Sequence, residues 1–253
     1  MRPLLLAALA VTVAVQDKTE GSTNPDVVLK EFKQAYVKAG KSDSARASAV
    51  RSLGLAPHAK TLSALSQVLL GDGSGQEVQN VRIAAAETIG ASFAKVPNAW
   101  TPLATVARNR DRKIPEVRIS AVKAMGQLAD PKSLSALQNF VDDKPFEMAK
   151  EAVDALAKVR DRSSVPLLIK QLREVERVPD DALLPELPFN GLGFGGVVAD
   201  DARNEQVVRR KVLYNPTLDT LKSLTGQDFT SYKEYQKWWS ANGSTFKVSG
   251  GGK

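Results

Sequence analysis

The sequence predicts an all-α fold, a right-handed superhelical solenoid of stacked helix pairs with a C-terminal helical cap. The first observation is a recurring stretch, which reads VRIAAAETIG at 81–90 and returns at 45–54, at 117–126 and, more loosely, at 148–157. The first three copies start 36 residues apart (81 − 45 and 117 − 81). A fixed period in this range is typical of architectures in which one helical unit stacks on the next. The second observation is the aromatic content of only 6%, which fits an Ala/Leu/Val helical stack better than a β-sheet protein.

The composition excludes several kinds of site. The chain has no cysteine, which removes disulfides, thiolate nucleophiles, iron–sulfur clusters and cysteine zinc sites. His58 is the one histidine, so a multi-histidine metal site is excluded as well. The formal net charge of +7 serves solubility or a weak attraction to acidic polymers. We therefore expect neither a metal ion nor a cofactor.

Residues 1–14 are predicted to be a cleavable signal peptide. Arg2 is followed by an apolar run from Leu4 to Val15, which is shorter than the roughly 20 residues that span a bilayer. A positive start before a short apolar run is typical of a secretory signal, and an uncleaved anchor is the alternative. We expect a secreted or periplasmic protein whose mature chain has no transmembrane span.

The predicted solenoid occupies residues 25–178. Asn24-Pro25 places a cap residue before a proline, and apolar residues at helical spacing then predict a helix over 25–39. Each copy of the motif forms one helix, and a second apolar helix lies between successive copies. Proline and glycine mark the turns, as at Pro57, Gly71, Pro97, Pro131 and Pro166. The repeated unit is a pair of helices, and about four pairs fit the span.

The motif helix carries a buried stripe. Val81, Ala85 and Ile89 lie at i, i+4 and i+8, and therefore on one face of the helix. The next copy repeats this stripe, with Ala121 at its centre. A small central residue lets neighbouring helices approach closely.

The pattern V-R-x-x-A-x-x-x-[IM]-G, with an acidic turn before it and a proline-marked helix after it, resembles the HEAT repeat. It is most similar to the short HEAT-like repeats of the phycobilin-lyase type, over residues 26–173. The resemblance implies that the V-R helix is the second of each pair and lines the concave, ligand-facing side. It also implies that acidic residues before V-R pair with stacked arginines. Asp111 and Glu116 fit that role, but a glycine-rich insertion separates Asp72 from its arginine, so we expect no continuous ladder.

Residues 179–202 interrupt the pattern with prolines, glycines and no helical periodicity. So long a loop is usually functional or disordered. The run 191–196 satisfies GxGxxG, but nucleotide binding needs a preceding strand, which Pro185 and Pro188 disfavour. We interpret the segment as a mobile loop or lid over the groove, with Phe189 and Phe194 as candidate contact residues.

Residues 203–243 are predicted to form a helical capping cassette, and residues 244–253 a flexible tail. Pro216 is expected to break the first helix of the cassette, and a capping box from Ser231 to Glu234 opens the last one. That last helix carries aromatic residues, which cap the final repeat or, alternatively, form a binding platform. LTGQDF at 224–229 and the following Trp238-Trp239 pair resemble terminal cassettes of secreted bacterial HEAT-like proteins.

Two sets of charged residues recur in phase with the repeats. The first set binds an anionic partner or bridges neighbouring repeats, and the resemblance favours bridging; its members are Arg46, Arg82 and Arg118. The second set alternates in sign along the stack; its members are Arg51, Glu87, Lys123 and Asp154. Because a phosphate backbone requires one sustained sign of charge, this alternation disfavours nucleic acid.

These observations predict a non-catalytic scaffold of the cell envelope that binds a protein partner on the concave face of the stack. The sequence contains no nucleophile elbow, phosphate loop or metal-ligand cluster, so we expect no enzymatic activity. One alternative is a bilin-lyase-like enzyme or accessory, which rests on the repeat resemblance alone. A further alternative is a binder of acidic polymer or nucleic acid.

A substitution at the centre of the stripe tests the predicted seam. We expect Ala85→Phe or Ala121→Phe to lower the free energy of unfolding by about 1–3 kcal/mol, because a large side chain would overpack the contact between neighbouring helices. Thermal melting followed by circular dichroism measures the effect. A melting curve that matches wild type would remove these alanines from the seam.

Overall fold

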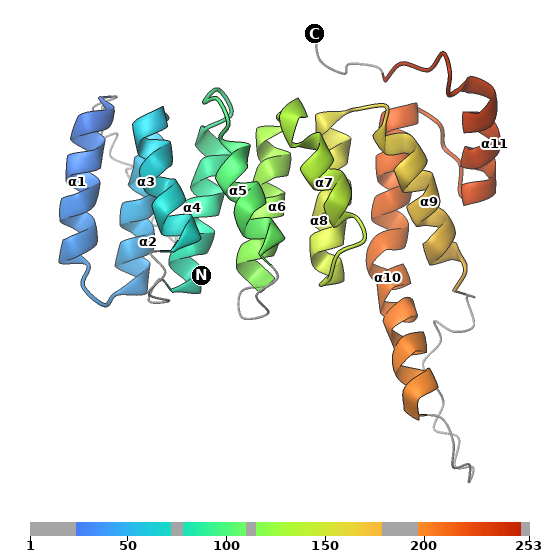
Figure 1. Cartoon of the computed structure of the whole chain (residues 1–253), viewed down its shortest axis with the longest axis horizontal. Helices are drawn as coiled ribbons and strands as arrows, with labels where there is room; N and C mark the ends of the chain where they lie inside the picture. The colour runs from blue at the N-terminus through green and yellow to red at the C-terminus, as the bar shows by residue number, and fades with distance from the viewer. Residues whose placement is uncertain (1–23, 72–77, 110–114, 179–196, 249–253) are drawn as a thin grey trace, which may run out of the picture.

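The computed structural model describes residues 24–71, 78–109, 115–178 and 197–248. In these ranges the chain is helical, with turns between the helices and no β-strand. Figure 1 shows the helices side by side in one row, from α1 at one end to α11 at the other. Two short 3₁₀ turns, η1 (Leu53–Leu55) and η2 (Pro131–Ser133), accompany them. The α-helices are α1 (Pro25–Lys38), α2 (Asp43–Ser52), α3 (Ala59–Leu70), α4 (Gln79–Ser92), α5 (Trp100–Arg108), α6 (Pro115–Leu128), α7 (Leu134–Phe140), α8 (Phe146–Val159), α9 (Ser164–Glu176), α10 (Val197–Thr225) and α11 (Tyr232–Asn242).

The helices form two layers. The even-numbered helices α2, α4, α6, α8 and α10 each contact the next one, and we call them the motif layer because the repeated sequence lies in α2, α4, α6 and α8. The odd-numbered helices make up the outer layer, in which α1 contacts α3, α3 contacts α5 and α9 contacts α11. Each outer helix from α1 to α9 packs against the motif-layer helix that follows it. The core therefore lies between the layers and runs along the row.

The last part of the chain continues the two layers. α10 packs against both α8 and α9, so it is the second helix of a fifth pair where about four pairs were expected. Only α11 stands outside the pairs, and it packs on α9. The handedness of the stack and the role of its C-terminal end as a cap remain predictions.

The expected break at Pro216 is wrong, because α10 runs through it from Val197 to Thr225. A proline inside a helix costs roughly 3 kcal/mol through a lost hydrogen bond and a clash. Here the flanking Leu213 and Leu221 are fully buried against the neighbouring helices. Burial of such side chains at about 1.5–3 kcal/mol each outweighs that local cost.

The segment interpreted as a loop, 179–202, is also helical at its end, since α10 begins at Val197. The sequence after Gly196 contains neither glycine nor proline until Pro216, so nothing local stops the helix from extending this far. The rest of that segment, with Phe189 and Phe194, lies outside the described residues, as do residues 1–14, predicted to be a signal peptide, and the acidic residues Asp72 and Asp111.

The start of the expected tail is attached to α11. The ring of Phe246 packs edge-on against Trp238 and Trp239, with ring centroids 5.2 and 5.9 Å away. The backbone N–H of Phe246 also donates to the Asn242 carbonyl. A flexible tail was expected because residues 244–253 lack periodicity, and a single aromatic anchor leaves no such pattern. Among the described residues, no helix combines the length and the hydropathy needed to cross a bilayer.

The buried stripe of the motif helix lies where the spacing predicts it. Val81, Ala85 and Ile89 have no exposed surface, and neither has Ala121. The glycine that ends the motif brings the helices closest. A Cβ on Gly126 would lie 3.0 Å from the Cα of Ala155 in α8. A Cβ on Gly90 of α4 would likewise lie 2.8 Å from the Cα of Ala124 in α6. The motif layer therefore depends on small residues where its helices meet.

The close backbone contact at Gly126 predicts that even a methyl side chain there would destabilise the fold. We expect Gly126→Ala to lower the free energy of unfolding by about 1–3 kcal/mol through overpacking. The higher helix propensity of alanine, about 1 kcal/mol, offsets only part of this. Urea denaturation measures the difference.

Gly54 offers the matched comparison, because its added Cβ would meet side-chain atoms of Ser92 and Thr88 at 3.0 Å instead of backbone. These side chains can shift, so Gly54→Ala should cost less than Gly126→Ala. If Gly126→Ala were as stable as wild type, close backbone approach would not govern this layer.

Candidate functional site

Arg118 bridges three segments of the chain. Its side chain is 6% exposed and lies between α5, α6 and the turn before α8. Nε donates to the carbonyl oxygen of Ala107 at 3.0 Å, and Nη1 donates to that of Lys144 at 3.1 Å. Nη2 donates to Asp143 Oδ2 at 2.9 Å, which forms a buried ion pair. All three nitrogens are therefore engaged within the protein.

Arg82 repeats part of this arrangement one unit earlier. Its Nε donates at 2.8 Å to the carbonyl oxygen of Leu69, next to the last residue of α3. Ala107, the acceptor of Arg118, holds the same position in α5. The last carbonyls of a helix have no partner within it and carry partial negative charge, so a guanidinium there satisfies and stabilises them. The V-R arginine thus closes the preceding helix of its own pair.

Arg46 behaves differently at the start of the stack. Its guanidinium lies 5.3 Å from the ring centroid of Tyr36 in α1, a cation–π contact. Its Nε is buried and has no hydrogen-bond partner. The three arginines share a sequence position and an orientation toward the preceding helix, but they do not share one chemical environment.

Glu116, one of the two acidic residues expected to pair with the arginines, has a different partner. Glu116 accepts a hydrogen bond at 2.6 Å from Gln79 Nε2, and its carboxylate pairs with no arginine among the described residues. Asp143, which follows Arg118 in the sequence, supplies the carboxylate instead. The resemblance implies a carboxylate in the turn before the motif helix, so the sequence offered no reason to expect one from the later turn before α8.

The second charged set lies on the exposed face of the motif layer. Arg51 and Glu87 are 3.6 Å apart and more than half exposed, so their attraction is weak. Asp154 pairs with Lys150 on its own helix at 2.9 Å, and this hydrogen bond is the main cause of a raised Lys150 pKa. Lys123 forms no ion pair among the described residues. The alternating charges are therefore balanced only in part.

A hollow of about 220 Å³ opens between α4 and α6 on this face, and we call it the motif-layer hollow. It brings Glu87 and Lys123 to one site, as the register predicts, but neither Arg51 nor Asp154 lines it. Ligand pockets usually span about 300–1,000 Å³, so this hollow suits one side chain of a partner. Its lining residues are Glu87, Ala91, Ser120, Lys123, Ala124 and Gln127.

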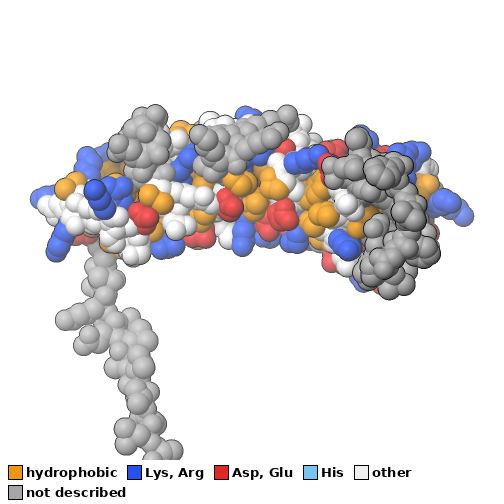
Figure 2. Space-filling model, turned by 90° about the horizontal axis from the view of Figure 1, so that it is seen from below, with side chains coloured by type: hydrophobic (Ala, Val, Ile, Leu, Met, Phe, Trp, Pro, Cys, Tyr) orange, Lys and Arg blue, Asp and Glu red, His pale blue; other side chains and the backbone are white. Residues whose placement is uncertain are grey.

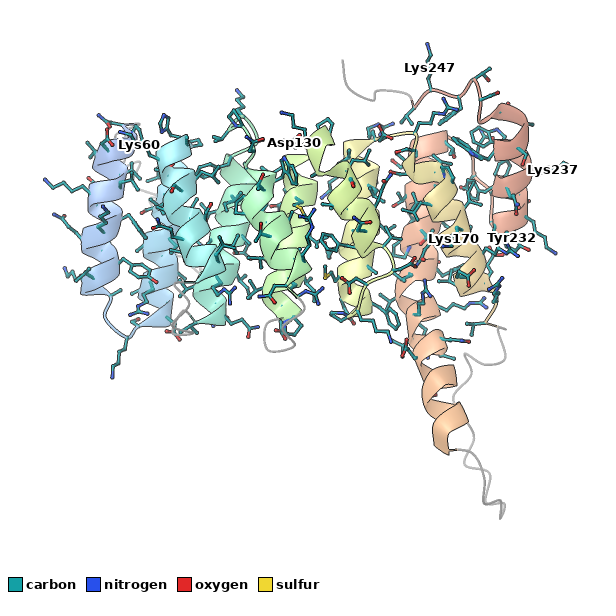
Figure 3. The ribbon with its side chains drawn as sticks, viewed as in Figure 1. Lys60, Asp130, Lys170, Tyr232, Lys237 and Lys247 are labelled. Carbon is teal, nitrogen blue, oxygen red and sulfur yellow. The ribbon has the colours of Figure 1, made fainter. Side chains whose placement is uncertain are left out.

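A second hollow, about 240 Å³, lies between α9 and α11, and we call it the α9–α11 groove. Figure 3 labels Lys170 on α9 and both Tyr232 and Lys237 on α11. The sequence suggested the aromatic residues of α11 as an alternative binding platform, but it did not indicate that Lys170 and Arg173 of α9 would lie beside them. The groove is lined by Pro166, Ile169, Lys170, Arg173, Gln236, Trp239 and Ser240.

The aromatic residues of α11 divide between packing and surface. Tyr235 is fully buried, its hydroxyl donates to the carbonyl of Gln227 at 2.9 Å, and burial raises its pKa to about 12. The Tyr232 N–H donates at 2.8 Å to Glu176 Oε1 on α9, where burial raises the carboxyl pKa. These two contacts fix the start of α11, while Trp238 and Trp239 keep part of their surface exposed. The expected packing role thus belongs mainly to Tyr235.

The described residues offer little for catalysis. His58 caps α3, where its Nδ1 accepts the Lys60 N–H at 3.2 Å. In the part of the chain that the structure describes, no three histidine, cysteine, aspartate or glutamate side chains gather to hold a metal ion. The absence of a cofactor and of enzymatic activity stays a prediction.

The family model for HEAT repeats matches residues 110–182, the span that holds α6, α7, α8 and α9. Within residues 110–182 this chain contains HEAT repeats. Copies of the same motif precede the matched span at 45–54 and 81–90. A comparison with curated proteins found no match. HEAT repeats generally mediate protein–protein interactions and are typically non-catalytic.

The buried ion pair between Arg118 and Asp143 predicts a large effect on stability at one of two adjacent aspartates. Asp143 is 13% exposed and Arg118 is 6% exposed, so Asp143→Ala leaves a buried guanidinium without its counter-charge. We expect a loss of about 3 kcal/mol in the free energy of unfolding, the lower end for a broken buried pair because Arg118 keeps its two carbonyl acceptors. Urea denaturation measures this loss.

Asp142 is the control, because its side chain is 54% exposed and pairs with the partly exposed Arg209. Asp142→Ala should cost less than about 1 kcal/mol, as is usual for surface pairs. Equal effects at the two aspartates would show that Arg118 does not need a carboxylate.

Proposed function

We propose that the chain is a non-catalytic interaction scaffold of the cell envelope that binds a protein partner on the exposed, concave face of the motif layer. The observation that carries the proposal is the motif-layer hollow, where two successive repeats contribute Glu87 and Lys123 from equivalent positions. A surface built from the same position of each repeat suits an extended contact with another protein. The general role of HEAT repeats agrees with it.

Arg82 and Arg118 already have partners inside the stack, so the proposed binding face does not include them. Arg82 and Arg118 donate to carbonyl groups within the stack, so contact with a partner falls to the second charged set. Arg51 and Glu87 form only a long, exposed pair. Such weakly paired groups can exchange their internal contact for one with a partner at little cost.

The alternation of charge favours a protein over a polyanion. Along the edge of the stack that Figure 2 shows, basic and acidic side chains are interspersed without a stripe of one sign. A nucleic acid would need a sustained basic track. A protein surface of mixed charge complements this face more closely. The bilin-lyase alternative rests on the repeat resemblance alone, and no described residue adds to it. The envelope location rests on residues 1–14.

Site-specific photo-crosslinking in the native cells tests the proposal. A photoreactive amino acid replaces Glu87 or Lys123 on the motif layer, and Ser63 or Thr105 on the outer layer as matched exposed controls. We expect both motif-layer positions to capture the same protein and the outer-layer positions to capture none of it. Charge reversal by Lys123→Glu should reduce capture from position 87. Equal capture from both layers, or none from the motif layer, would contradict the proposed face.

A further inference from the structure

The α9–α11 groove lies in the outer layer, away from the motif-layer hollow. Its walls come from α9 and α11, which are held together at both ends of α11. At one end, the Tyr232 N–H donates to Glu176, and at the other, Arg162 donates to the carbonyl of Gly243. A groove whose walls are fixed in advance loses little conformational freedom when it binds a ligand. This surface is thus ready to bind without rearrangement.

The groove carries positive charge that no described residue neutralises. Lys170 and Arg173 are exposed, lie at i and i+3 on α9, and form no ion pair among the described residues. Two described carboxylates near the end of α9 are engaged elsewhere. Glu174 pairs with Arg177 at 2.8 Å, and Glu176 accepts from Tyr232. Two cations one helical turn apart therefore face solvent beside the hollow.

The other part of the groove is apolar and rigid. Trp239 lines it together with Pro166 and the largely buried Ile169. The guanidinium of Arg162 lies 5.8 Å from the indole centroid and the ring of Phe246 lies 5.9 Å away, so two contacts hold this side chain. Tryptophan and arginine are the residues most often found at the energetic centres of protein interfaces.

The size of the groove limits its occupant. A hollow of about 240 Å³ is smaller than the usual pocket for a small ligand, and it accommodates one or two side chains of a peptide. Single-stranded nucleic acid requires a basic track that follows its backbone, whereas both cations of this groove come from one turn of α9. Gln236 and Ser240 complete the lining with neutral polar groups.

We infer that the α9–α11 groove binds an acidic linear segment of a partner protein. One apolar side chain of the segment packs against Trp239, and neighbouring carboxylates pair with Lys170 and Arg173. The Arg173 guanidinium presents a planar fork of donors that matches a carboxylate. This surface is separate from the proposed motif-layer face, so the failure of either proposal leaves the other standing.

Fluorescence anisotropy tests the inference with the full chain and a short labelled peptide of aspartate and glutamate around one central phenylalanine. We expect binding that weakens as salt rises, because exposed charges are screened. The double variant Lys170→Glu, Arg173→Glu should bind the peptide at least about tenfold more weakly, since carboxylates then face like charges. Ser240→Trp should also weaken binding, because it fills the hollow without changing its charge.

The matched control is the double variant Lys30→Glu, Lys33→Glu. These lysines are exposed on α1, have the same i, i+3 spacing, and give the same change in net charge at the other end of the stack. This variant should keep wild-type affinity. The inference would be overturned by no binding of the peptide, by equal loss in both double variants, or by undiminished affinity after removal of the phenylalanine. Tighter binding of a single-stranded oligonucleotide through the same residues would overturn it in favour of nucleic acid.

Discussion

The close approach of neighbouring motif-layer helices is the constraint on which the rest of the structure depends. At Gly126, a single added carbon would lie 2.7 Å from the Cβ of Ala155, so only glycine permits this spacing. The spacing then decides what the other residues can reach. Arg118, near the other end of the same helix, reaches the end of α5 and the turn before α8 at hydrogen-bond distance. The glycine and the arginine of the motif thus belong to one geometric requirement, although they lie eight residues apart in the sequence (126 − 118).

This coupling explains why the arginines form structural bonds instead of a free binding strip. When a motif-layer helix packs this tightly on its neighbours, the arginine in its first turn lies beside the end of the preceding helix. The last carbonyl groups of that helix have no partner within it and can accept hydrogen bonds from the arginine. Arg82 and Arg118 both meet such a carbonyl. Arg46 follows the first helix of the stack and meets the ring of Tyr36 instead. The charges that these helices leave exposed to solvent are those of the second set, such as Arg51 and Glu87.

The sequence was sufficient for features whose cause is local. Period and spacing predicted the helix pairs, the buried Val81, Ala85 and Ile89, and the capping box at Ser231, because each depends on residues a few positions apart. The helix through Pro216 could not be predicted in this way, since burial against α8 and α9, far along the chain, outweighs the local rule. The carboxylate that pairs with Arg118 could not be predicted for the same reason, because Asp143 lies 25 residues away in the sequence.

The α9–α11 groove shows why the irregular end of a repeat protein carries information that its period does not. An exposed charge at a repeated position lies near its own copies along the stack, so a single sign there would accumulate repulsion, and the exposed set from Arg51 to Asp154 alternates in sign. Lys170 and Arg173 stand at the last described pair, where no further repeat follows in the described part of the chain. Unpaired cations there meet no equivalent neighbour, so they persist at low cost to stability. A site that recognises a ligand by charges of one sign is accordingly less costly to stability beside α11 than along the motif layer.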